Sequence, residues 1–454
     1  MTATVEPGVA ARRLALQALA KIDDGGFANI ILGPLLEESG LETRDRALVS
    51  ELVYGTTRMR SALDFLIDRH VLEPPDPSGR NALRLGAYQL RYLRVPAHAA
   101  VSASVAASPK RLRGFVNAVL RKIAAEDPPP WPDMATELSY PQWIVDLFVS
   151  EFGEVDAEAA LRWMNQAATV DTRNDGYIQN RASQWVAAEV AAQPGELVVD
   201  LCAAPGGKAT ALAALGARVI AIDLNPARVA QMHANIVKLG LPEPGAALAS
   251  AESSAPGLAS SETPASEPST SEPSASKRRS VEPSGSEPRC AGPSTSESPP
   301  SDPPAPDSGS SRLPATVAVV ADGRSTPLRA GCADRVLVDA PCSGLGVLQR
   351  RPDARWRIDA ASLVRLPDLQ FALIEEAIRL CRPGGVVAYS VCTLSSAETS
   401  EVARRVSAAH PELSLLDPPN DPWHAIDGGG GRLLPHEAEA DGMALFQWRR
   451  AEAG

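Results

Sequence analysis

The chain of 454 residues has room for two or three domains, and its hydrophobic content of 44% is that of an ordinary globular protein. It has no run of about 18 uninterrupted apolar residues and no signal-peptide pattern at its start, which argues against a membrane span or secretion. Six cysteines without a CxxC pair are too few for a disulfide scaffold and argue against a metal site. We therefore expect a cytoplasmic protein with free thiols.

Charge is distributed unevenly along the chain. The net charge of −11 opposes nucleic-acid binding, but residues 1–126 carry 17 Lys and Arg against 13 Asp and Glu. Residues 243–315 carry 5 basic against 10 acidic residues. Because contact with RNA depends on local charge rather than on the sum, the mildly basic front part is a candidate RNA-binding region.

Residues 1–126 are predicted to form an all-helical domain. Apolar residues recur there at spacings of three and four, the period of an amphipathic helix, in 9–22, 45–71, 82–96 and 114–126. The sequence DPPPWP at 127–132 removes backbone donors and stops helix continuation, so it predicts a domain boundary. Residues 127–194 are interpreted as a linker and a small extension of the next domain.

From residue 195 the pattern changes to short runs rich in Val and Ile, most of them alternating with helix-like stretches. Such runs are typical of strands buried on both faces, and five are expected: 196–201, 218–224, 316–322, 334–340 and 385–391. Alternation of strand and helix predicts a parallel sheet with right-handed crossovers. Residues 195–454 are therefore predicted to form a doubly wound α/β domain.

One tract interrupts the α/β pattern. Residues 243–315 contain 14 of the 40 prolines, no aromatic residue, and repeats such as SEPST and SEPSA. This composition cannot bury enough apolar surface to offset chain entropy, so the tract is predicted to be disordered. It follows a helix expected near 226–239, on the face opposite the usual ligand crevice. A tolerated linker is favoured, and a regulatory element is the alternative.

Three successive strand ends predict a nucleoside site. In DLCAAPGGK at 200–208, Gly206 and Gly207 would let the backbone approach a ligand. The second strand ends in Asp223, which can accept hydrogen bonds from ribose hydroxyls, and the third in Asp322, which can receive an adenine amine. The glycine spacing does not fit a dinucleotide fingerprint, and no basic cluster for a pyrophosphate is seen. A nucleoside is favoured over NAD, and a plain glycine-rich turn is the simpler alternative.

Two cysteines follow strands at the edge of the sheet where α/β proteins bind ligands. Cys342 lies in VDAPCSGLG after the fourth strand, and Cys392 lies in YSVCT after the fifth. Both are interpreted as chemically active. Cys202, Cys332 and Cys381 are interpreted as small apolar residues of the core, which is the usual role of a buried cysteine.

The motifs DLCAAPGGK, VDAPCSGLG and YSVCT together resemble the RNA 5-methylcytosine methyltransferase family, as do QNRASQWVA at 179–187 and DGMALFQW at 441–448. RLGAYQLRYLRVPAHAAV and GFVNAVLRKI resemble the NusB-like helical domain fused to the bacterial 16S ribosomal RNA enzyme. The resemblance covers nearly everything except 243–315. It implies an S-adenosylmethionine-dependent, Rossmann-like methyltransferase domain preceded by an all-α NusB-like domain.

The resemblance also implies a reaction: methylation of carbon 5 of a cytosine in small-subunit ribosomal RNA, with S-adenosyl-L-methionine as cofactor. Carbon 5 is a weak nucleophile, so the Cys392 thiolate would first add to carbon 6. Asp339 would share a proton with the ring nitrogen, and the activated carbon would take the methyl from the sulfonium. Cys342 would assist release of the product. The target base must be out of any stack for this attack.

The residues implied to bind the cofactor belong to the first glycine-rich loop and to three later strand ends. They are Cys202, Ala203, Ala204, Pro205, Gly206, Gly207, Lys208, Asp223, Asp322 and Asp339. Three positions depart from the pattern common in the family: Val391 in place of Thr, Asn180 in place of Asp, and Thr399-Ser400 in place of Asn-Glu after Glu398. The last change puts polar support of the nucleophile loop in doubt.

Two basic groups are candidates for RNA contact. The first comprises Arg350, Arg351, Arg355 and Trp356, which could grip phosphates and stack a base or form a solvated basic loop. The second comprises Lys110, Arg111, Arg113, Arg121 and Lys122, for which a solvated helix face is favoured over RNA contact.

Other functions stay open at this point. A transfer RNA or 23S ribosomal RNA cytosine methyltransferase would use the same motifs, and the NusB-like half favours the small-subunit RNA. A non-catalytic RNA-binding factor would not need Cys342 and Cys392, and a small-molecule methyltransferase would not need the helical domain. DNA and membranes are not expected as partners. The sequence does not fix the oligomeric state, and a monomer is expected.

Overall fold

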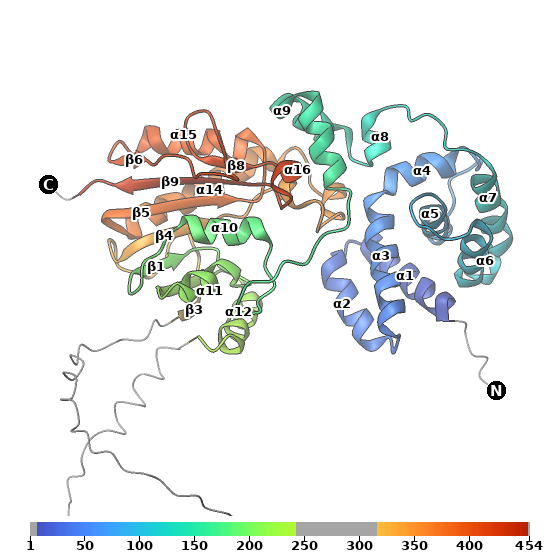
Figure 1. Cartoon of the computed structure of the whole chain (residues 1–454), viewed down its shortest axis with the longest axis horizontal. Helices are drawn as coiled ribbons and strands as arrows, with labels where there is room; N and C mark the ends of the chain where they lie inside the picture. Colours follow the sequence, from blue (N-terminus) through green and yellow to red (C-terminus); the bar gives the residue numbers. More distant parts are fainter. Residues whose placement is uncertain (1–6, 242–315, 453–454) are drawn as a thin grey trace, which may run out of the picture. The chain divides into compact units, whose positions relative to one another are not determined.

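The computed structural model describes residues 7–241 and 316–452, which belong to one compact unit of mutually contacting elements (Figure 1). The tract 243–315, for which the sequence predicts disorder, lies outside the described residues. None of the described helices is long and apolar enough to cross a membrane.

Residues 7–125 form only helices, which confirms the prediction of an all-helical region. These helices are α1 (Pro7–Asp23), α2 (Ala28–Glu38), α3 (Thr43–Arg58), α4 (Arg60–Asp68), α5 (Pro77–Arg91), α6 (Ala97–Ala107), η1 (Lys110–Leu112) and α7 (Arg113–Ala125). Their apolar faces meet in one core that includes Leu52, Leu63 and Leu120. A β-carbon on Gly86 would lie 2.3 Å from the Leu120 side chain, so the close approach of α5 to α7 requires glycine there.

Three further helices precede the sheet: α8 (Met134–Leu138), α9 (Gln142–Trp163) and α10 (Arg181–Glu189). Ile144 and Phe148 of α9 pack in a core with Leu345 and Leu348, which follow Cys342 in the sequence. The segment interpreted as a linker and extension therefore supports the loop that carries a candidate catalytic cysteine.

All five predicted strands are present: β1 (Leu197–Asp200), β2 (Arg218–Asp223), β3 (Thr316–Val320), β4 (Ala333–Asp339) and β5 (Cys381–Val391). They pair in parallel in the order β3-β2-β1-β4-β5. Because β1 lies between β2 and β4, the strand order reverses there, and ligands of α/β sheets bind at such a switch point.

The predicted parallel sheet is present, and the C-terminal segment extends it with antiparallel strands that the sequence does not predict. These are β6 (Leu413–Leu415), β7 (His424–Ala425), β8 (Gly431–Leu433) and β9 (Met443–Arg450). Strand β9 pairs antiparallel with β5, β6 and β8. No helix separates β3 from β4, so strand and helix do not alternate throughout.

Helices cover both faces of the sheet (Figure 1). On one face, α10, α11 (Gly207–Ala214) and α12 (Pro226–Lys238) pack on residues such as Val198. On the other, α14 (Ser362–Leu380) and α15 (Ser400–Ala409) pack on residues such as Val199. Val198 and Val199 are neighbours on β1 and point to opposite faces, which is why both faces of the strand are apolar. The carboxyl ends of the strands remain open.

Candidate active site

A cavity of about 1030 Å³ lies at the carboxyl ends of β1 to β5. Eight of the predicted site residues line it: Cys202, Ala204, Pro205, Asp223, Asp322, Asp339, Cys342 and Cys392. Four predicted cofactor residues do not: Ala203, Gly206, Gly207 and Lys208. The parallel strands therefore bring residues that are up to 190 positions apart in the sequence into one cleft, as the sequence predicts.

The two candidate catalytic cysteines are in contact. The Sγ atoms of Cys342 and Cys392 are 3.2 Å apart. The hydrogen bond with Cys392, together with burial, raises the pKa of the Cys342 thiol well above its usual range. Cys342 therefore stays protonated and can donate its S–H to the sulfur of Cys392.

Asp339 is fixed beside the cysteine pair by two donors. Lys208 Nζ lies 2.6 Å from Asp339 Oδ2, and Ser390 Oγ donates to Oδ1 over 2.7 Å. Burial opposes the charged form of Lys208, but the Asp339 carboxylate prevails and raises the lysine pKa. Lys208 is thus placed to hold the Asp339 carboxylate in the cleft, although it does not line the cleft itself.

Asp200 is a further acid beneath this pair, fully buried at the end of β1. Neither of its carboxylate oxygens has a hydrogen-bond partner among the residues that the structure describes. Burial and the nearby Asp339 raise the pKa of Asp200 to about 8. Asp200 is therefore mostly protonated at neutral pH, so Lys208 pairs with Asp339 rather than with Asp200.

Glu398 connects the two cysteine loops, and only the family pattern around this residue points to polar support there. Its buried carboxylate accepts hydrogen bonds from Ser343 N and Oγ at 2.9 and 2.5 Å. It also accepts from Thr393 Oγ1 at 3.2 Å and from Gln370 Nε2 at 3.0 Å. Ser343 follows Cys342 and Thr393 follows Cys392, so one carboxylate holds both loops. The altered residues after Glu398 leave this support intact.

Replacing Glu398 with alanine is expected to disorder both loops. Ser343 N would be left buried without its acceptor, while Ser343 Oγ, Thr393 Oγ1 and Gln370 Nε2 would each lose one hydrogen bond and keep another partner, which costs about 1–3 kcal/mol of unfolding free energy. We expect a lower melting temperature and a fall in kcat for methyl transfer of more than about tenfold, because misplaced catalytic groups lose much of their effect. Glu401→Ala, on an exposed position of α15, is the matched control. Wild-type kcat in a folded Glu398→Ala variant would refute this positioning role.

The glycines of the first loop are required by packing. Gly206 has φ of +99°, and a β-carbon there would meet Met232 of α12 at 2.9 Å. A β-carbon on Gly207 would meet Gln179 at 3.2 Å. Neither glycine lines the cleft, and Met232 of α12 and Gln179 occupy the space beside their α-carbons. Their part in cofactor binding stays a prediction.

Arg173 holds the same loop by hydrogen bonds, and sequence analysis does not identify it as a site residue. Its guanidinium donates to the Gly207 carbonyl over 2.7 Å and to Thr210 Oγ1 over 3.1 Å. Tyr177 lies under that guanidinium, 4.8 Å from it, and contacts the Pro205 carbonyl. No motif marks this segment, because its role depends on contacts with a loop about 30 residues away in the sequence.

Asp223 and Asp322, the two acids predicted to bind a nucleoside, both line the cleft but differ in burial and in hydrogen-bond partners. Asp223 is buried and accepts from Ala204 N at 3.3 Å and Asn225 N at 2.9 Å, which leaves acceptor capacity for a ligand hydroxyl. Asp322 is half-buried and is bound by Arg324 through a bidentate ion pair of 3.0 and 2.7 Å. The pKa of Asp322 is lowered by that pair. Asp322 would have to share its oxygens with Arg324 to bind an amine.

Arginines lie in the cleft, although the sequence shows no basic cluster for a pyrophosphate. Four arginines line the cleft: Arg228, Arg324, Arg350 and Arg351. Three have a carboxylate within 4 Å, since Arg228 lies 3.6 Å from Asp223, Arg324 pairs with Asp322, and Arg350 binds Asp171 and Asp441. Arg351 is exposed and has no such partner within the described residues. The cleft thus contains one arginine that is free to bind a phosphate.

Arg355 is neither an RNA-gripping residue of the cleft nor part of a solvated loop, so both interpretations of it are wrong, whereas base stacking by the half-buried Trp356 stays a prediction. Arg355 is fully buried, 3.8 Å from the Tyr140 ring, and donates to the Ser139 carbonyl and to Asn165. Trp356 Nε1 donates to the Thr57 carbonyl over 2.9 Å. These contacts join residues up to 299 positions apart, which periodicity and motif spacing do not report.

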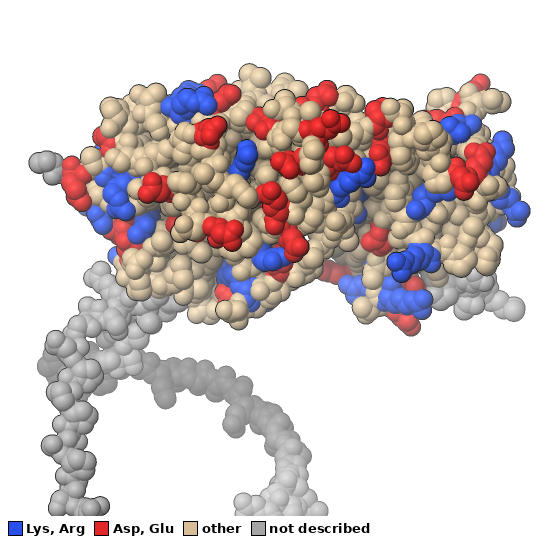
Figure 2. Space-filling view, turned by 45° about the horizontal axis from the view of Figure 1, so that its top comes forward, with Lys and Arg blue, Asp and Glu red and all other residues tan. Residues whose placement is uncertain are grey.

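The second basic group lies on a solvent-exposed surface. Lys110, Arg111, Arg121 and Lys122 are exposed, and Arg113 is half-buried. Arg111 pairs with Asp76 at 2.7 Å. Figure 2 shows acidic and basic side chains interspersed over the face it views. A solvated face agrees with these contacts, and RNA binding by the group stays a prediction.

The three cysteines interpreted as core residues differ in place. Cys381 is buried in the core, which confirms the interpretation, and Cys332 is half-buried against the same core. Cys202 packs on that core and also lines the cleft. Burial raises the pKa of the Cys202 thiol far above its usual value, so Cys202 is a poor nucleophile.

Comparison with known proteins agrees with these observations. The sequence matches the family described as 16S rRNA methyltransferase RsmB/F over residues 187–256 and 307–447, and the NusB family over residues 9–125. A relative from Thermus thermophilus, named Ribosomal RNA small subunit methyltransferase B, is 30% identical over 97% of this chain and 98% of its own. A relative of the same name from Serratia proteamaculans is 26% identical over 95% and 96%. The crystal structure of a protein called PH0851 matches with a TM-score of 0.70 at 18% identity, over 98% of this chain and 99% of that one, which shows the fold.

Proposed function

Because this chain belongs to the 16S rRNA methyltransferase RsmB/F family and begins with a NusB-family region, we propose that it methylates carbon 5 of a cytosine in small-subunit ribosomal RNA. The proposed methyl donor is S-adenosyl-L-methionine. Relatives that span nearly the whole chain carry the name small subunit methyltransferase, which supports the choice of RNA. Methylation of ribosomal RNA would place the protein in the cytoplasm.

The contact between Cys342 and Cys392 is the observation that carries the proposal. A methyltransferase that acts on a nitrogen or oxygen nucleophile needs no thiol, whereas carbon 5 of cytosine must first be activated by addition at carbon 6. Two thiols with Sγ atoms 3.2 Å apart, in a cleft with a lysine-paired carboxylate, provide that chemistry.

Each side chain has a distinct part in the proposed reaction. The Cys392 thiolate forms a bond to carbon 6, and Asp339 faces the ring nitrogen whose negative charge grows as the bond forms. A carboxylate can stabilise that nitrogen only through a shared proton, so Asp339 must hold a proton at that step. Lys208, 2.6 Å away, can supply or receive it. In the release step, water takes up the proton on carbon 5, and its electron pair re-forms the carbon 5–carbon 6 double bond. The bond from carbon 6 to sulfur breaks, and Cys392 departs as a thiolate that the S–H of Cys342 stabilises.

The cleft fits a nucleoside cofactor at the ends of β1 to β3. Asp223 is buried there with spare acceptor capacity, and the cavity of about 1030 Å³ is large enough for a nucleoside and a base together. Cys202, Ala204, Pro205 and Asp223 would contact the cofactor, with Asp322 at the rim. When bound, the cofactor supplies an electrophilic methyl group.

Transfer of tritiated methyl groups tests the proposal directly. The protein would be incubated with S-adenosyl-L-methionine labelled in its methyl group and with purified 16S RNA, 23S RNA or transfer RNA. Label in 16S RNA that is recovered as 5-methylcytidine is expected. Label in one of the other RNAs would move the substrate there, and label in small molecules or in none of the RNAs would overturn the proposal.

A further inference from the structure

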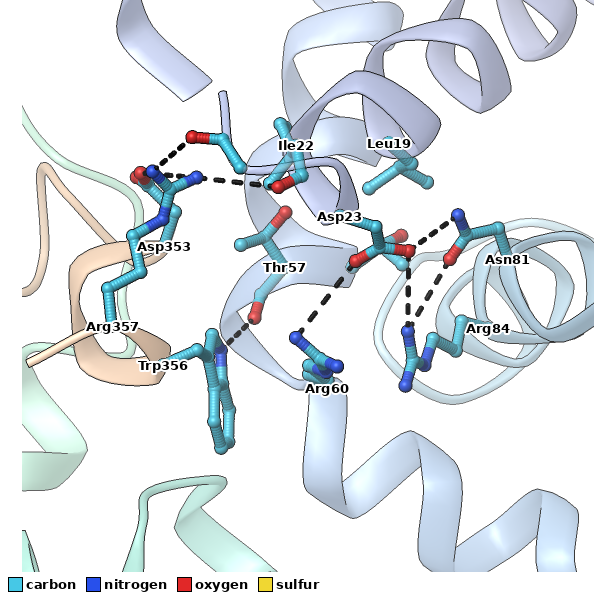
Figure 3. Close-up of a pocket in the computed structure, with 12 residues that line it drawn as sticks. Leu19, Ile22, Asp23, Thr57, Arg60, Asn81, Arg84, Asp353, Trp356 and Arg357 are labelled. Atoms are coloured by element: carbon cyan, nitrogen blue, oxygen red, sulfur yellow. Dashed lines mark hydrogen bonds and ion pairs between the residues drawn. The ribbon is translucent and has the colours of Figure 1, made fainter. Parts of the chain in front are cut away.

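A second cavity, of about 150 Å³, lies where α1, α3 and α5 meet the loop that follows Cys342. Figure 3 shows Trp356 and Arg357 of the loop on one side, Asp23, Asn81 and Arg84 on the other, and Arg60 between them. A cavity of about this volume in another protein holds benzene, so the space suits one six-membered ring. The cavity is outside the cleft described above, and it has no part in the proposed chemistry.

Arg60 at this cavity has unused hydrogen-bonding capacity. Its nearest carboxylate oxygen, on Asp23, is 4.0 Å away, and the guanidinium makes no hydrogen bond within the described part of the chain. Its side chain is 41% exposed. Burial and the neighbouring Arg84 both lower the pKa of Arg60, so an anion at this position would be favourable. The five N–H donors of an arginine are suited to a phosphate.

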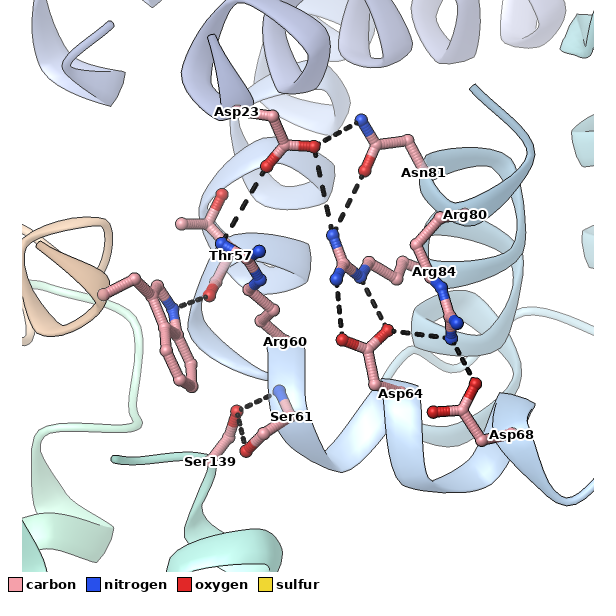
Figure 4. A network of polar contacts seen from close by, with 11 residues as sticks. Asp23, Thr57, Arg60, Ser61, Asp64, Asp68, Arg80, Asn81, Arg84 and Ser139 are labelled. Carbon is pink, nitrogen blue, oxygen red and sulfur yellow. Dashed lines mark hydrogen bonds and ion pairs between the residues drawn. The ribbon is translucent and has the colours of Figure 1, made fainter. Parts of the chain in front are cut away.

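The neighbouring charges are already matched, which distinguishes Arg60 from them. Asp64 forms a bidentate pair with Arg84, at 2.8 and 2.6 Å, and also lies 3.4 Å from Arg80 (Figure 4). Asp23 accepts from Asn81 Nδ2 over 2.8 Å. The network of Figure 4 therefore leaves Arg60 with one long ion pair, 4.0 Å from Asp23, and without a hydrogen bond among the described residues.

Two threonine hydroxyls at the cavity also lack partners. Thr56 is 1% exposed and Thr57 is 6% exposed, and neither Oγ1 has a hydrogen-bond partner among the described residues. A helical threonine can usually bond to the carbonyl one turn earlier, yet neither does so here. A buried hydroxyl without a hydrogen-bond partner destabilises the fold by about 1–3 kcal/mol. A ligand with polar edges could form the missing hydrogen bonds.

Trp356 supplies a fixed aromatic surface beside these groups. Its Nε1 donates to the Thr57 carbonyl over 2.9 Å, which holds the indole next to α3. The Arg60 guanidinium lies 5.7 Å from the Trp356 ring centre. A fixed indole beside unpaired hydroxyls and an arginine that makes no hydrogen bond among the described residues matches the way proteins bind unstacked bases: the ring stacks, the edge accepts hydrogen bonds, and the phosphate pairs with arginine.

We propose that this cavity binds one unstacked base of single-stranded RNA, with its phosphate on Arg60, its ring against Trp356 and its edge on Thr56 and Thr57. This inference rests on the proposed function, because it assumes an RNA substrate. The loop links the cavity to the cleft, since Arg351 lines the cleft and Trp356 lines the cavity. Five residues span at most about 18 Å, so the bound nucleotide would be a near neighbour of the target cytosine.

Thr57→Val separates ligand binding from a structural role. Removing an unpaired buried hydroxyl should leave the melting temperature unchanged or raise it, because no native hydrogen bond is lost. If the hydroxyl binds a base, affinity for 16S RNA should fall about fivefold. Arg60→Gln should weaken the same binding about tenfold and reduce the slope of log K against log salt by about 0.7, as expected for one lost contact to single-stranded phosphate.

Arg404→Gln, which changes an exposed arginine on α15 outside both basic groups, is the matched control. Affinity would be measured by filter binding with transcribed 16S RNA over a range of salt, and kcat should stay unchanged in Thr57→Val and Arg60→Gln while KM rises. Wild-type affinity and salt slope in both variants, with an active parent enzyme, would overturn the proposed base site. A parent enzyme that neither binds nor methylates RNA would instead refute the proposed function, and this site with it. If Arg60→Gln fails to fold, the RNA affinity of Thr57→Val alone tests the proposed base site.

Discussion

Cys392→Ala should abolish methyl transfer to RNA, with a loss of at least about a thousandfold in kcat, because no other group in the cleft can form the bond to carbon 6. The neighbouring Cys342 has a pKa raised well above its usual range, so it stays protonated and cannot replace the missing thiolate. Cys202 is excluded for the same reason. Binding of S-adenosyl-L-methionine should be retained, since the side chain lost is at the end of β5 rather than at β1 to β3.

Tritium transfer and equilibrium dialysis with the labelled cofactor would measure these two quantities. Cys332→Ala is the matched control, because it removes a thiol that does not line the cleft and is half-buried against the core. Activity of Cys392→Ala within about tenfold of the parent enzyme would identify a different nucleophile and contradict the adduct mechanism.

Cys342→Ala should produce the opposite defect, in which the adduct forms and persists. The Sγ of Cys342 is 3.2 Å from that of Cys392, so its S–H is placed to stabilise the sulfur as it departs. Without that donor, release slows while addition continues, and the protein should accumulate as a covalent complex with RNA. A band of reduced mobility that survives denaturing gel electrophoresis would show it.

The double variant Cys342→Ala, Cys392→Ala is the control for that band, because it lacks the thiol that forms the bond. A folded Cys342→Ala protein that gives no such band and turns over normally would remove Cys342 from the release step. A band in the double variant would mean that another residue forms the cross-link.

The sequence was sufficient where a residue's role depends on its position at a strand end. Cys342, Cys392, Asp339 and Asp223 each follow a Val-rich run, and parallel pairing places such ends along one edge. The resemblance to the methyltransferase family is confirmed by the family match over residues 187–256 and 307–447. The helical region before the sheet is likewise predicted from the spacing of its apolar residues by three and four.

Roles that depend on long-range side-chain contacts could not be predicted. Glu398 binds Ser343 across 55 positions, and Arg355 binds the Ser139 carbonyl across 216 positions. In the sequence, Arg355 is one of several arginines in QRRPDARWR and looks like part of a solvated basic loop. Burial against Tyr140 and α9 changes its role, because it ties the loop after Cys342 to the helices before the sheet.

Strand β9 is an element that the sequence pattern does not predict. Its sequence MALFQWRR was recognised only as part of a family motif, because its mostly apolar run shows no strand alternation. In the structure it pairs antiparallel with β5 and carries Trp448 and Phe446 into the core. An antiparallel edge on a parallel sheet follows from chain connectivity, which local sequence pattern does not report.

The most direct test of the central claim is a bisulfite map of ribosomal RNA from cells with and without this protein. Bisulfite converts cytosine but spares 5-methylcytosine, so each methylated position is read individually. Loss of protection at one cytosine of the small-subunit RNA in cells that lack the protein is the predicted result. A map that is identical in both kinds of cell would contradict the proposed target and the role given to the helical region in selecting it.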